Sequence, residues 1–498
     1  MSATAFYGLM AFIAVCAALE RYLDWRDKEA AKAEEDADDD LVVTFDVPHA
    51  KQEPAPAPET TGTLLDYLEH GGTMGMETAV GRASDHARGI LYQGPWTHPA
   101  DGFQTHTRRC ARALARAGVP VHLRALTPVM AATAEGSEEE RVEKEVWDLI
   151  HASISAYSVL VHQVVPTQQL LDRITMPSAL GAQIYTPEQW SAQLKNRVLY
   201  VVYERTPIPS NDLRALGRVG QVWVACERDA ESLRQGGVEE SKIRVVPVPY
   251  ASDDPLIGLR SRERDAGPPR FYHIGKWEPR KAADRILGAF LRAFKPGEAE
   301  LYLKTSLLDC SFDGWSATPE VAVATRLKDP KVRANGWTDE NVFEWVNVQT
   351  DILPATELRK IHEWGDVYVT LSRGEGFDMP AFDAKLSGNL MVYTPSGGPQ
   401  DFAEGSDILV EPTGLVPTHA FYNWGAEARW LDFDLNVAVE AFQKARATIL
   451  STRGTVPSWS GPVESTKLAS FSSEAVGQRM RDALQDLVGP EGNLGDKP

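Results

Sequence analysis

The feature that most constrains the fold is an alternation of short apolar runs with segments of helical period, which occurs twice along the chain. The first series begins at "GILYQ" (89–93), and the second restarts at "RFYHIG" (270–275). Apolar runs too short for helices, separated by amphipathic helices, indicate parallel strands with helices packed on the sheet. The sequence therefore predicts an α/β fold of two Rossmann-like, doubly wound domains that face each other across a cleft at the strand carboxyl ends.

Both series resolve into individual elements. The first predicts strands at 89–93, 119–126, 157–163, 197–203, 221–226 and 242–247. The second predicts strands at 270–275, 299–304, 366–371 and 389–394. Helices are expected at about 103–117, across 227–237, from about Lys281 to Phe294, and from near Pro380. Between the two series, residues 250–269 are polar, contain Pro and Gly, and keep no period, which is typical of an interdomain connection.

The N-terminal region differs from the rest of the chain. Residues 3–19 are apolar and uncharged, close to the lower limit of about 17 residues for a membrane span. We expect residues 1–26 to be a short membrane anchor, with a cleaved signal or a soluble amphipathic start as alternatives. Arg21, Arg26 and Lys28 would then keep the following chain in the cytoplasm. Residues 27–62 are acidic and Pro-rich and are predicted to be a disordered linker.

These observations divide the chain into five parts. After the anchor and the linker, we expect an N-terminal Rossmann-like acceptor domain (63–255) and a C-terminal Rossmann-like nucleotide-sugar domain (256–450). Residues 451–498 are expected to form a helical tail that packs back on the N-terminal domain.

Charge and cysteine content exclude several functions. The formal net charge is −19, and so acidic a chain matches a phosphate polymer poorly, which argues against nucleic acid as the main ligand. The four cysteines lie far apart without metal-ligand spacing: Cys16, Cys110, Cys226 and Cys310. Isolated buried thiols in a reducing compartment are the expected reading. No metal site and no bound cofactor are predicted.

Two segments of the second series carry candidate chemistry. In "DVYVTLSRGEGFDMPAFDAKLSGN" (366–389), a buried strand runs through a Gly-containing turn into a helix. Glycines allow close backbone approach, and a helix N-terminus attracts phosphate. We expect Asp383 to lie in the first helical turn. The second segment, "GKWEPRKAADRI" (275–286), places three cations at a helix start, where an external anion would offset their repulsion. Taken singly, each segment is also compatible with a solvated turn.

Together these segments resemble the large retaining GT-B glycosyltransferase family with the paired-acid E-x7-E motif (the group 1, or family 4-like, enzymes). Such enzymes have G-R-x-x-x-x-K after a strand, and here Gly275, Lys276 and Lys281 stand at those places. They then have E-G-F-G-L-P and a second Glu, matched by Glu375-Gly376-Phe377-Asp378-Met379-Pro380 and Asp383. The order of the motifs adds specificity that none has alone. The specific match covers about 270–405, and the architectural one about 89–450.

The resemblance implies roles for individual residues. Lys276, Arg280 and Lys281 would bind a donor diphosphate, Glu375 the transferred sugar and Asp383 the nucleotide ribose. Gly275 and the main chain of Gly376, Phe377, Asp378 and Met379 would line the phosphate site. The departures from the family pattern are Lys at 276, Asp at 378 and Asp at 383, and they put the donor's identity in question.

On the acceptor side, the resemblance points to four positions, and His162 joins Glu375 and Lys281 as a catalytic candidate. His162 matches a strand-end histidine near the transferred sugar, although a lone His after an apolar strand is more often structural. Gly102 and His106 belong to the first loop, and Glu204 follows a strand toward the cleft.

The resemblance implies a hexosyltransferase-like enzyme that transfers a sugar from a nucleotide-diphosphate sugar to an acceptor hydroxyl, with retention and without metal. The acceptor, whether glycan, lipid or protein, is not specified by the sequence. A nucleotide-sugar epimerase and an inactive GT-B module that binds a nucleotide or a partner remain the alternatives.

Overall fold

The computed structural model describes residues 88–94, 102–125, 138–152, 154, 156–176, 186–254, 257, 267–306, 319–419, 422, 424–452, 466–489 and 494. The predicted anchor and acidic linker lie outside these residues. Within them, no helix has both the length and the apolar character that a membrane crossing requires.

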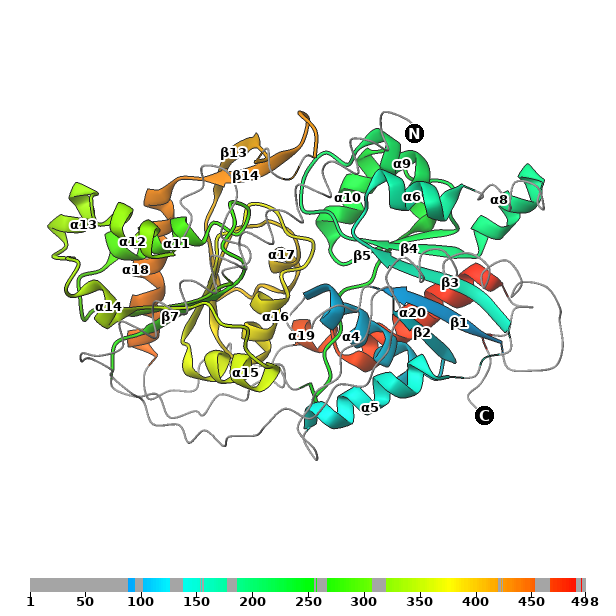
Figure 1. The fold of residues 1–498 in the computed structure, drawn as a ribbon, viewed down its shortest axis with the longest axis horizontal. Coiled ribbons are helices and arrows are strands. Elements are labelled where there is room, and N and C mark those ends of the chain that lie inside the picture. Colours follow the sequence, from blue (N-terminus) through cyan, green and yellow to red (C-terminus); the bar gives the residue numbers. More distant parts are fainter. Residues whose placement is uncertain are drawn as a thin grey trace, which may run out of the picture. The chain divides into compact units, whose positions relative to one another are not determined.

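The first parallel sheet forms the N-terminal domain (Figure 1). Its strand order is β2-β1-β3-β4-β5-β6. The strands are β1 (Arg88–Gly94), β2 (Val121–Ala125), β3 (Ala156–Val164), β4 (Arg197–Val201), β5 (Gln221–Val224) and β6 (Ile243–Val245). The helices of this part of the chain are α4 (Gly102–Arg116), α5 (Glu138–Ile150), α6 (Gln168–Thr175), α8 (Pro187–Lys195), α9 (Ser210–Leu216), α10 (Glu227–Gln235) and the short η1 (Glu240–Lys242).

The second parallel sheet has the order β12-β11-β10-β7-β8-β9. Its strands are β7 (Arg270–Ile274), β8 (Glu300–Lys304), β9 (Val346–Gln349), β10 (Val367–Thr370), β11 (Leu390–Tyr393) and β12 (Ile408–Leu409). Its helices are α11 (Ala283–Ala293), α12 (Pro319–Arg326), α13 (Pro330–Ala334), α14 (Val342–Trp345), α15 (Ala355–Trp364), α16 (Met379–Leu386), α17 (Gly398–Phe402) and α18 (Leu435–Ser451). Renumbered from β7, this is the 3-2-1-4-5-6 order of doubly wound sheets, and it reverses between β7 and β10.

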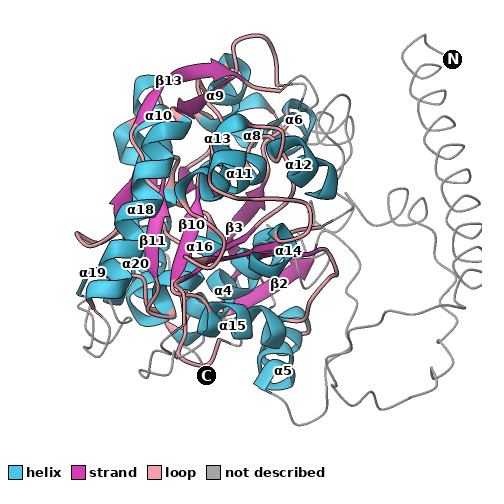
Figure 2. Cartoon of the chain, turned by 90° about the vertical axis from the view of Figure 1, so that its left-hand side faces the viewer, coloured by secondary structure: helices cyan, strands magenta, loops and turns pink. Residues whose placement is uncertain are grey.

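Helices cover both faces of the second sheet (Figure 2), and alternating side chains of its strands are therefore buried on either face. Phe271 and Val367 pack into an apolar cluster with residues of α11 and α18. Their neighbours Tyr272 and Tyr368 face the opposite way, into a second cluster with residues of α16. That second cluster also contains residues of β1, β3 and β4, so one apolar core joins both domains.

Two further elements complete the fold. The antiparallel pair β13 (Pro412–Pro417) and β14 (Arg429–Phe433) extends from the C-terminal domain, and Thr206 of the N-terminal domain bridges to Arg429. After α19 (Thr466–Ala469), helix α20 (Ser473–Val488) packs on α4, and Gln221 Nε2 of β5 donates to the Ala483 carbonyl of α20 at 2.6 Å.

The predicted fold class is confirmed, and every strand predicted from the sequence is present. Two helix starts differ from the predicted ones by one or two residues. Helix α11 begins at Ala283, so Lys281 lies in the turn before the helix, and Ala282 there is left-handed at φ 54°. Helix α16 begins at Met379, which places Asp383 in the second turn.

Candidate functional site

The candidate site lies at the carboxyl ends of β7 and β10, where the strand order of the second sheet reverses. Ligands of open α/β sheets bind at such a point because the connections on its two sides diverge and leave a crevice. Here β7 leads into the turn 275–281, and β10 leads into the turn 371–378 before α16. The two segments selected from the sequence are therefore neighbours in space.

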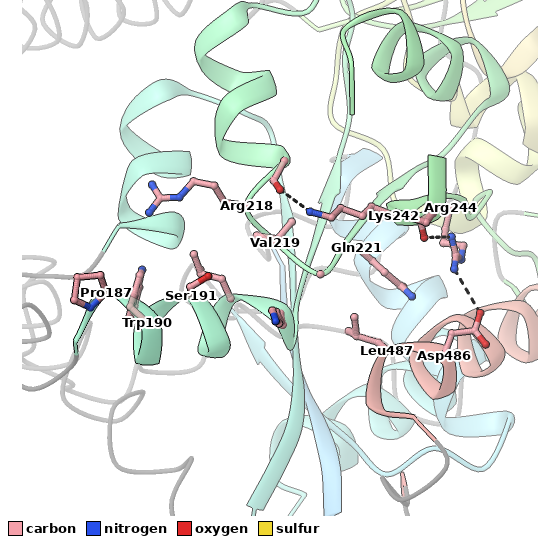
Figure 3. A pocket seen from close by; sticks show the side chains of 15 residues that line it. Pro187, Trp190, Ser191, Arg218, Val219, Gln221, Lys242, Arg244, Asp486 and Leu487 are labelled. Carbon is pink, nitrogen blue, oxygen red and sulfur yellow. Dashed lines mark hydrogen bonds and ion pairs between the residues drawn. The ribbon is translucent and has the colours of Figure 1, made fainter. Parts of the chain in front are cut away.

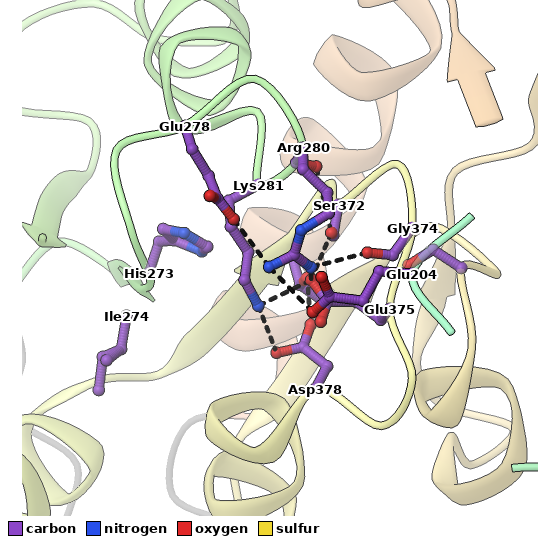
Figure 4. Close-up of polar contacts among 12 residues, drawn as sticks. Glu204, His273, Ile274, Glu278, Arg280, Lys281, Ser372, Gly374, Glu375 and Asp378 are labelled. Carbon is purple, nitrogen blue, oxygen red and sulfur yellow. Dashed lines mark hydrogen bonds and ion pairs between the residues drawn. The ribbon is translucent and has the colours of Figure 1, made fainter. Parts of the chain in front are cut away.

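A buried ion pair forms the centre of the site (Figure 4). The Lys281 Nζ lies 2.7 Å from Glu375 Oε1 and 3.7 Å from Asp378 Oδ1. The Ser372 hydroxyl donates to the same Glu375 oxygen. Burial favours neutral Glu375, but the charges of Arg280 and Lys281 outweigh it and lower the pKa of Glu375 to about 2. Glu375 is therefore a carboxylate at neutral pH, able only to accept hydrogen bonds.

Arg280 joins this pair to both domains. Its guanidinium contacts Glu375 at 2.9 Å and donates to the Gly374 carbonyl at 2.8 Å. It also lies 2.7 Å from Glu278 and 3.1 Å from Glu204, which follows β4 of the N-terminal domain. Only 6% of Arg280 is exposed. This residue therefore acts as a bridge whose donors are largely taken by the protein.

The charges of the cluster do not balance. Four carboxylates, Glu204, Glu278, Glu375 and Asp378, surround the two cations Arg280 and Lys281. Burial, with the charges of Glu375 and Glu278, raises the pKa of Glu204 to about 7, although Arg280 opposes the shift. Burial likewise raises the pKa of Asp378. Part of the excess negative charge is thus removed by protonation near neutral pH.

Asp378 occupies an unusual backbone conformation at the start of α16. Its φ is 64°, in the left-handed region where a side chain is costly and where Asp and Asn are tolerated best after Gly. The Thr370 hydroxyl donates to its carboxylate at 2.6 Å. Gly adopts this conformation without steric cost, whereas Asp adopts it while adding a carboxylate.

The glycine turn packs directly against the N-terminal domain. A Cβ at Gly374 would lie 2.1 Å from the Glu204 carbonyl oxygen, and one at Gly376 would lie 2.0 Å from Val202 Cγ1. Glycine is required at both positions because backbone and side chain of the other domain occupy that space. The Arg228 guanidinium of α10 adds contacts to the carbonyls of Glu375 and Ser396.

Asp383 belongs to a separate buried ion pair. Its Oδ1 lies 2.8 Å from Arg109 Nη2 of α4, and Arg109 Nε donates to Asp254 at 2.6 Å. Burial raises the pKa of Asp383 to about 6 even though Arg109 opposes it. The structure thus brings Arg280, Lys281, Glu375, Asp378 and Glu204 together and gives Asp383 a different charged partner.

The remaining sequence candidates lie in the two turns of the site, and the Lys276 carbonyl accepts from the Glu278 N–H at 3.0 Å. Lys276 is exposed, and Gly275 donates its N–H to the Lys304 carbonyl. Phe377 packs against Phe382, and Met379 is the first residue of α16.

The acceptor-side histidines are buried in the N-terminal domain. His162 lies within β3, and His106 packs edge-on against Tyr200 from α4. Burial lowers the pKa of each to about 3, so both are neutral. Gly102 is exposed at the first position of α4.

Sequence reasoning missed the residues that neutralise or cover the basic turn. Glu278 stands inside the second motif and was available as a signal, but Arg109 has no local pattern that links it to Asp383. The loop between β13 and β14 places the Tyr422 hydroxyl 2.7 Å from Glu278 Oε2. Trp430 donates to the Glu204 carbonyl at 3.0 Å. These aromatic residues had no predicted role.

No protein-family model and no curated protein sequence matches the chain, whereas solved structures do. A sucrose-phosphate synthase from Thermosynechococcus elongatus aligns with a TM-score of 0.50 and 16% identity, over 80% of this chain and 99% of that chain. A glycosyltransferase from Rickettsia africae aligns with a TM-score of 0.48 and 10% identity, over 81% and 100%. HepE from Anabaena, solved with UDP and glucose, aligns with a TM-score of 0.47 and 14% identity, over 80% of this chain and 100% of that chain. With the two six-stranded sheets, the likeness to the first shows that this chain has the GT-B fold.

Proposed function

We propose that this protein is a glycosyltransferase that moves a sugar from a nucleotide-diphosphate sugar to an acceptor hydroxyl. The observation that carries the proposal is the buried Lys281–Glu375 pair at the point where the second sheet reverses its order. A cation suited to phosphate and an ionised acceptor of hydroxyl hydrogen bonds stand side by side in the crevice of a GT-B fold. Their positions in the sequence match the family's donor-binding residues.

In this proposal the two partners separate when donor binds. The Lys281 ammonium exchanges the Glu375 carboxylate for oxygens of the diphosphate, and Glu375 becomes free to accept from sugar hydroxyls. Arg280 keeps Glu375 oriented through its contact at 2.9 Å. As the bond between the sugar and the diphosphate breaks, negative charge grows on the leaving oxygen, and a fixed ammonium stabilises that charge.

The finer features of the reaction are also proposals. Transfer would proceed with retention: the acceptor hydroxyl attacks from the face that the diphosphate leaves, and a phosphate oxygen takes its proton. The residues of the site supply positive charge without a metal ion. Asp383 would bind the ribose after Arg109 moves away. The acceptor would enter from the side of Glu204, and an anchor in residues 1–26 would hold the enzyme at the cytoplasmic membrane face.

A second candidate is a GT-B module that binds nucleotide and transfers nothing. One observation favours it: Arg280 already has four polar partners, and four carboxylates surround the two cations. Such a site has less free positive charge for a diphosphate than the motif alone suggests.

A donor screen decides between the two. The full chain is mixed with uridine, guanosine and adenosine diphosphate sugars and heated; a donor at about 100 times its Kd stabilises the fold by about 2.7 kcal/mol. The hit is then assayed for release of nucleoside diphosphate, with and without EDTA. Release that survives EDTA supports the metal-free transferase, and binding without release supports the module. Absence of any shift across the panel contradicts both.

A further inference from the structure

A polar cavity, separate from the donor cluster, lies at the amino ends of strands in the N-terminal sheet (Figure 3). It has a volume of about 550 Å³, within the range of small-molecule sites. Three lining residues, Lys195, Gly220 and Lys242, lie one or two positions before β4, β5 and β6. The cavity is therefore at the amino ends of these strands, whereas Glu204 of the cleft follows the carboxyl end of β4.

The cavity is basic although the chain is acidic. Four cations line it, Lys195, Arg218, Lys242 and Arg244, and Asp486 is the one acid among the described lining residues. The C-terminal ends of α8, α9 and α20 are close by, and each offers about half a negative charge. These ends and Asp486 together leave positive charge in excess. In a chain of net charge −19, such a concentration of positive charge stabilises a bound anion.

Two of the cations are held in place by the protein. Lys242 Nζ donates to the Gly217 carbonyl at 2.7 Å. Arg244 donates to the carbonyls of Ser241 and Ile243 and reaches Asp486 at 3.4 Å. Lys195 and Arg218 are exposed, and neither side chain has a hydrogen bond or ion pair among the described residues. The cavity thus combines two fixed positive charges with two that are available to a ligand.

Part of the remaining wall is apolar. Trp190, Leu194, Val219 and Leu487 are lining residues, and Arg197 lies over the Trp190 ring at 5.0 Å. In Figure 3, Trp190 and Ser191 lie below Arg218, and Leu487 projects from α20 beside Gln221. A bare inorganic anion would leave this apolar surface uncovered. The wall fits an anionic group that is attached to a carbon skeleton.

We propose that this cavity binds a phosphate ester, with the phosphate against Lys195 and Arg218 and the carbon skeleton against Trp190. Two sources have this chemistry: the headgroup of an anionic phospholipid and a soluble phosphate ester. The site is separate from the donor cluster, so it neither requires nor tests the proposed transferase activity.

The test uses the full chain in two arms. Calorimetry measures binding of glycerol 3-phosphate. Flotation measures binding to vesicles of phosphatidylcholine alone and of phosphatidylcholine mixed with phosphatidylglycerol, so that any contribution of residues 1–26 is present in every sample. The variant is Lys195→Gln with Arg218→Gln. The control is Lys328→Gln with Lys331→Gln, which removes the same charge from exposed positions of the C-terminal domain.

We expect the wild type and the control to bind equally and the paired variant to bind more weakly. The loss is about thirtyfold on the mixed vesicles, from roughly 1 kcal/mol per cation. On glycerol 3-phosphate it is about tenfold or more. Binding of glycerol 3-phosphate with no preference for the mixed vesicles identifies a soluble ester, and preference for the mixed vesicles identifies the headgroup. If the paired variant binds like the wild type, if the control loses as much as the variant, or if the wild type binds neither probe, the proposal is wrong.

Discussion

Replacing Arg280 with Met tests whether the bridge described above holds the site together. The substitution keeps most of the side-chain volume and removes the guanidinium that contacts Glu375, Glu278 and Glu204 within 3.1 Å. Four carboxylates then surround Lys281 alone, and the formal charge of the cluster changes from −2 to −3.

The expected loss of stability is large. Removing one partner of a buried ion pair costs about 3–5 kcal/mol because the remaining charge is left uncompensated. Arg280 is only 6% exposed, so solvent screens little of this loss. For a domain of roughly 150–250 residues, about 4 kcal/mol lowers the Tm by about 8–16 °C.

Calorimetric melting of a double-mutant cycle measures the effect. Glu204→Gln alone removes one of the carboxylates that Arg280 faces across the domains, and in the Arg280→Met background it should recover about 1–2 kcal/mol. Lys328→Met, at an exposed position, is the control and should change the Tm little. A drop of less than 2 °C in Arg280→Met, or no recovery in the double variant, would refute the assignment of Arg280 as the bridge.

Three further predictions follow from the same site. Lys281→Ala should weaken binding of a bare nucleoside diphosphate and slow transfer. Glu375→Gln frees Lys281, so it should keep or raise the affinity for the diphosphate while it slows transfer. Calorimetry with the diphosphate and a transfer assay on both variants check this. The pKa of Glu204 is raised from 4.5 to about 7. Its protonation therefore contributes about 3 kcal/mol of stability, which is present below pH 4.5 and is lost as the pH rises through 7. The Tm should fall less steeply with rising pH in Glu204→Gln than in the wild type, and identical slopes would contradict the shift. Gly374→Ala places a Cβ 2.1 Å from the Glu204 carbonyl oxygen and should cost about 1–3 kcal/mol, which urea unfolding measures; an unchanged midpoint would show that the domains do not meet there.

The fold could be predicted from the sequence because its signals are local. Each parallel strand buried on both faces appears as a short apolar run, and "GILYQ" and "RFYHIG" mark the start of each domain without reference to anything distant. Strands β9 and β12 were missed because neither forms such an apolar run. Two of the four residues of β9 are polar and one of these is exposed, and β12 has only two residues.

The candidate site was predictable only where both partners belong to motifs that the sequence shows. Lys281 and Glu375 belong to two motifs in fixed order, and the fold brings them together. Arg109 and Asp383 are 274 positions apart, and their contact depends on how α4 meets α16. The expectation of an external anion rested on the three cations of the basic turn alone. In the structure, Glu204 of the other domain lies 3.1 Å from Arg280 and supplies negative charge there.

Helix α20, the last helix in the described part of the chain, completes the first domain, and this has a consequence for synthesis. Helix α20 packs on α4, and Gly477 lies so close to α4 that a Cβ would be 2.4 Å from the Ala113 carbonyl oxygen. On the ribosome, β6 emerges about 240 residues before the end of α20, an interval of about 10–50 s at usual elongation rates. During that time the part of α4 that packs on α20 in the folded protein lacks this partner. A nascent chain truncated before residue 473 would leave that part of α4 uncovered.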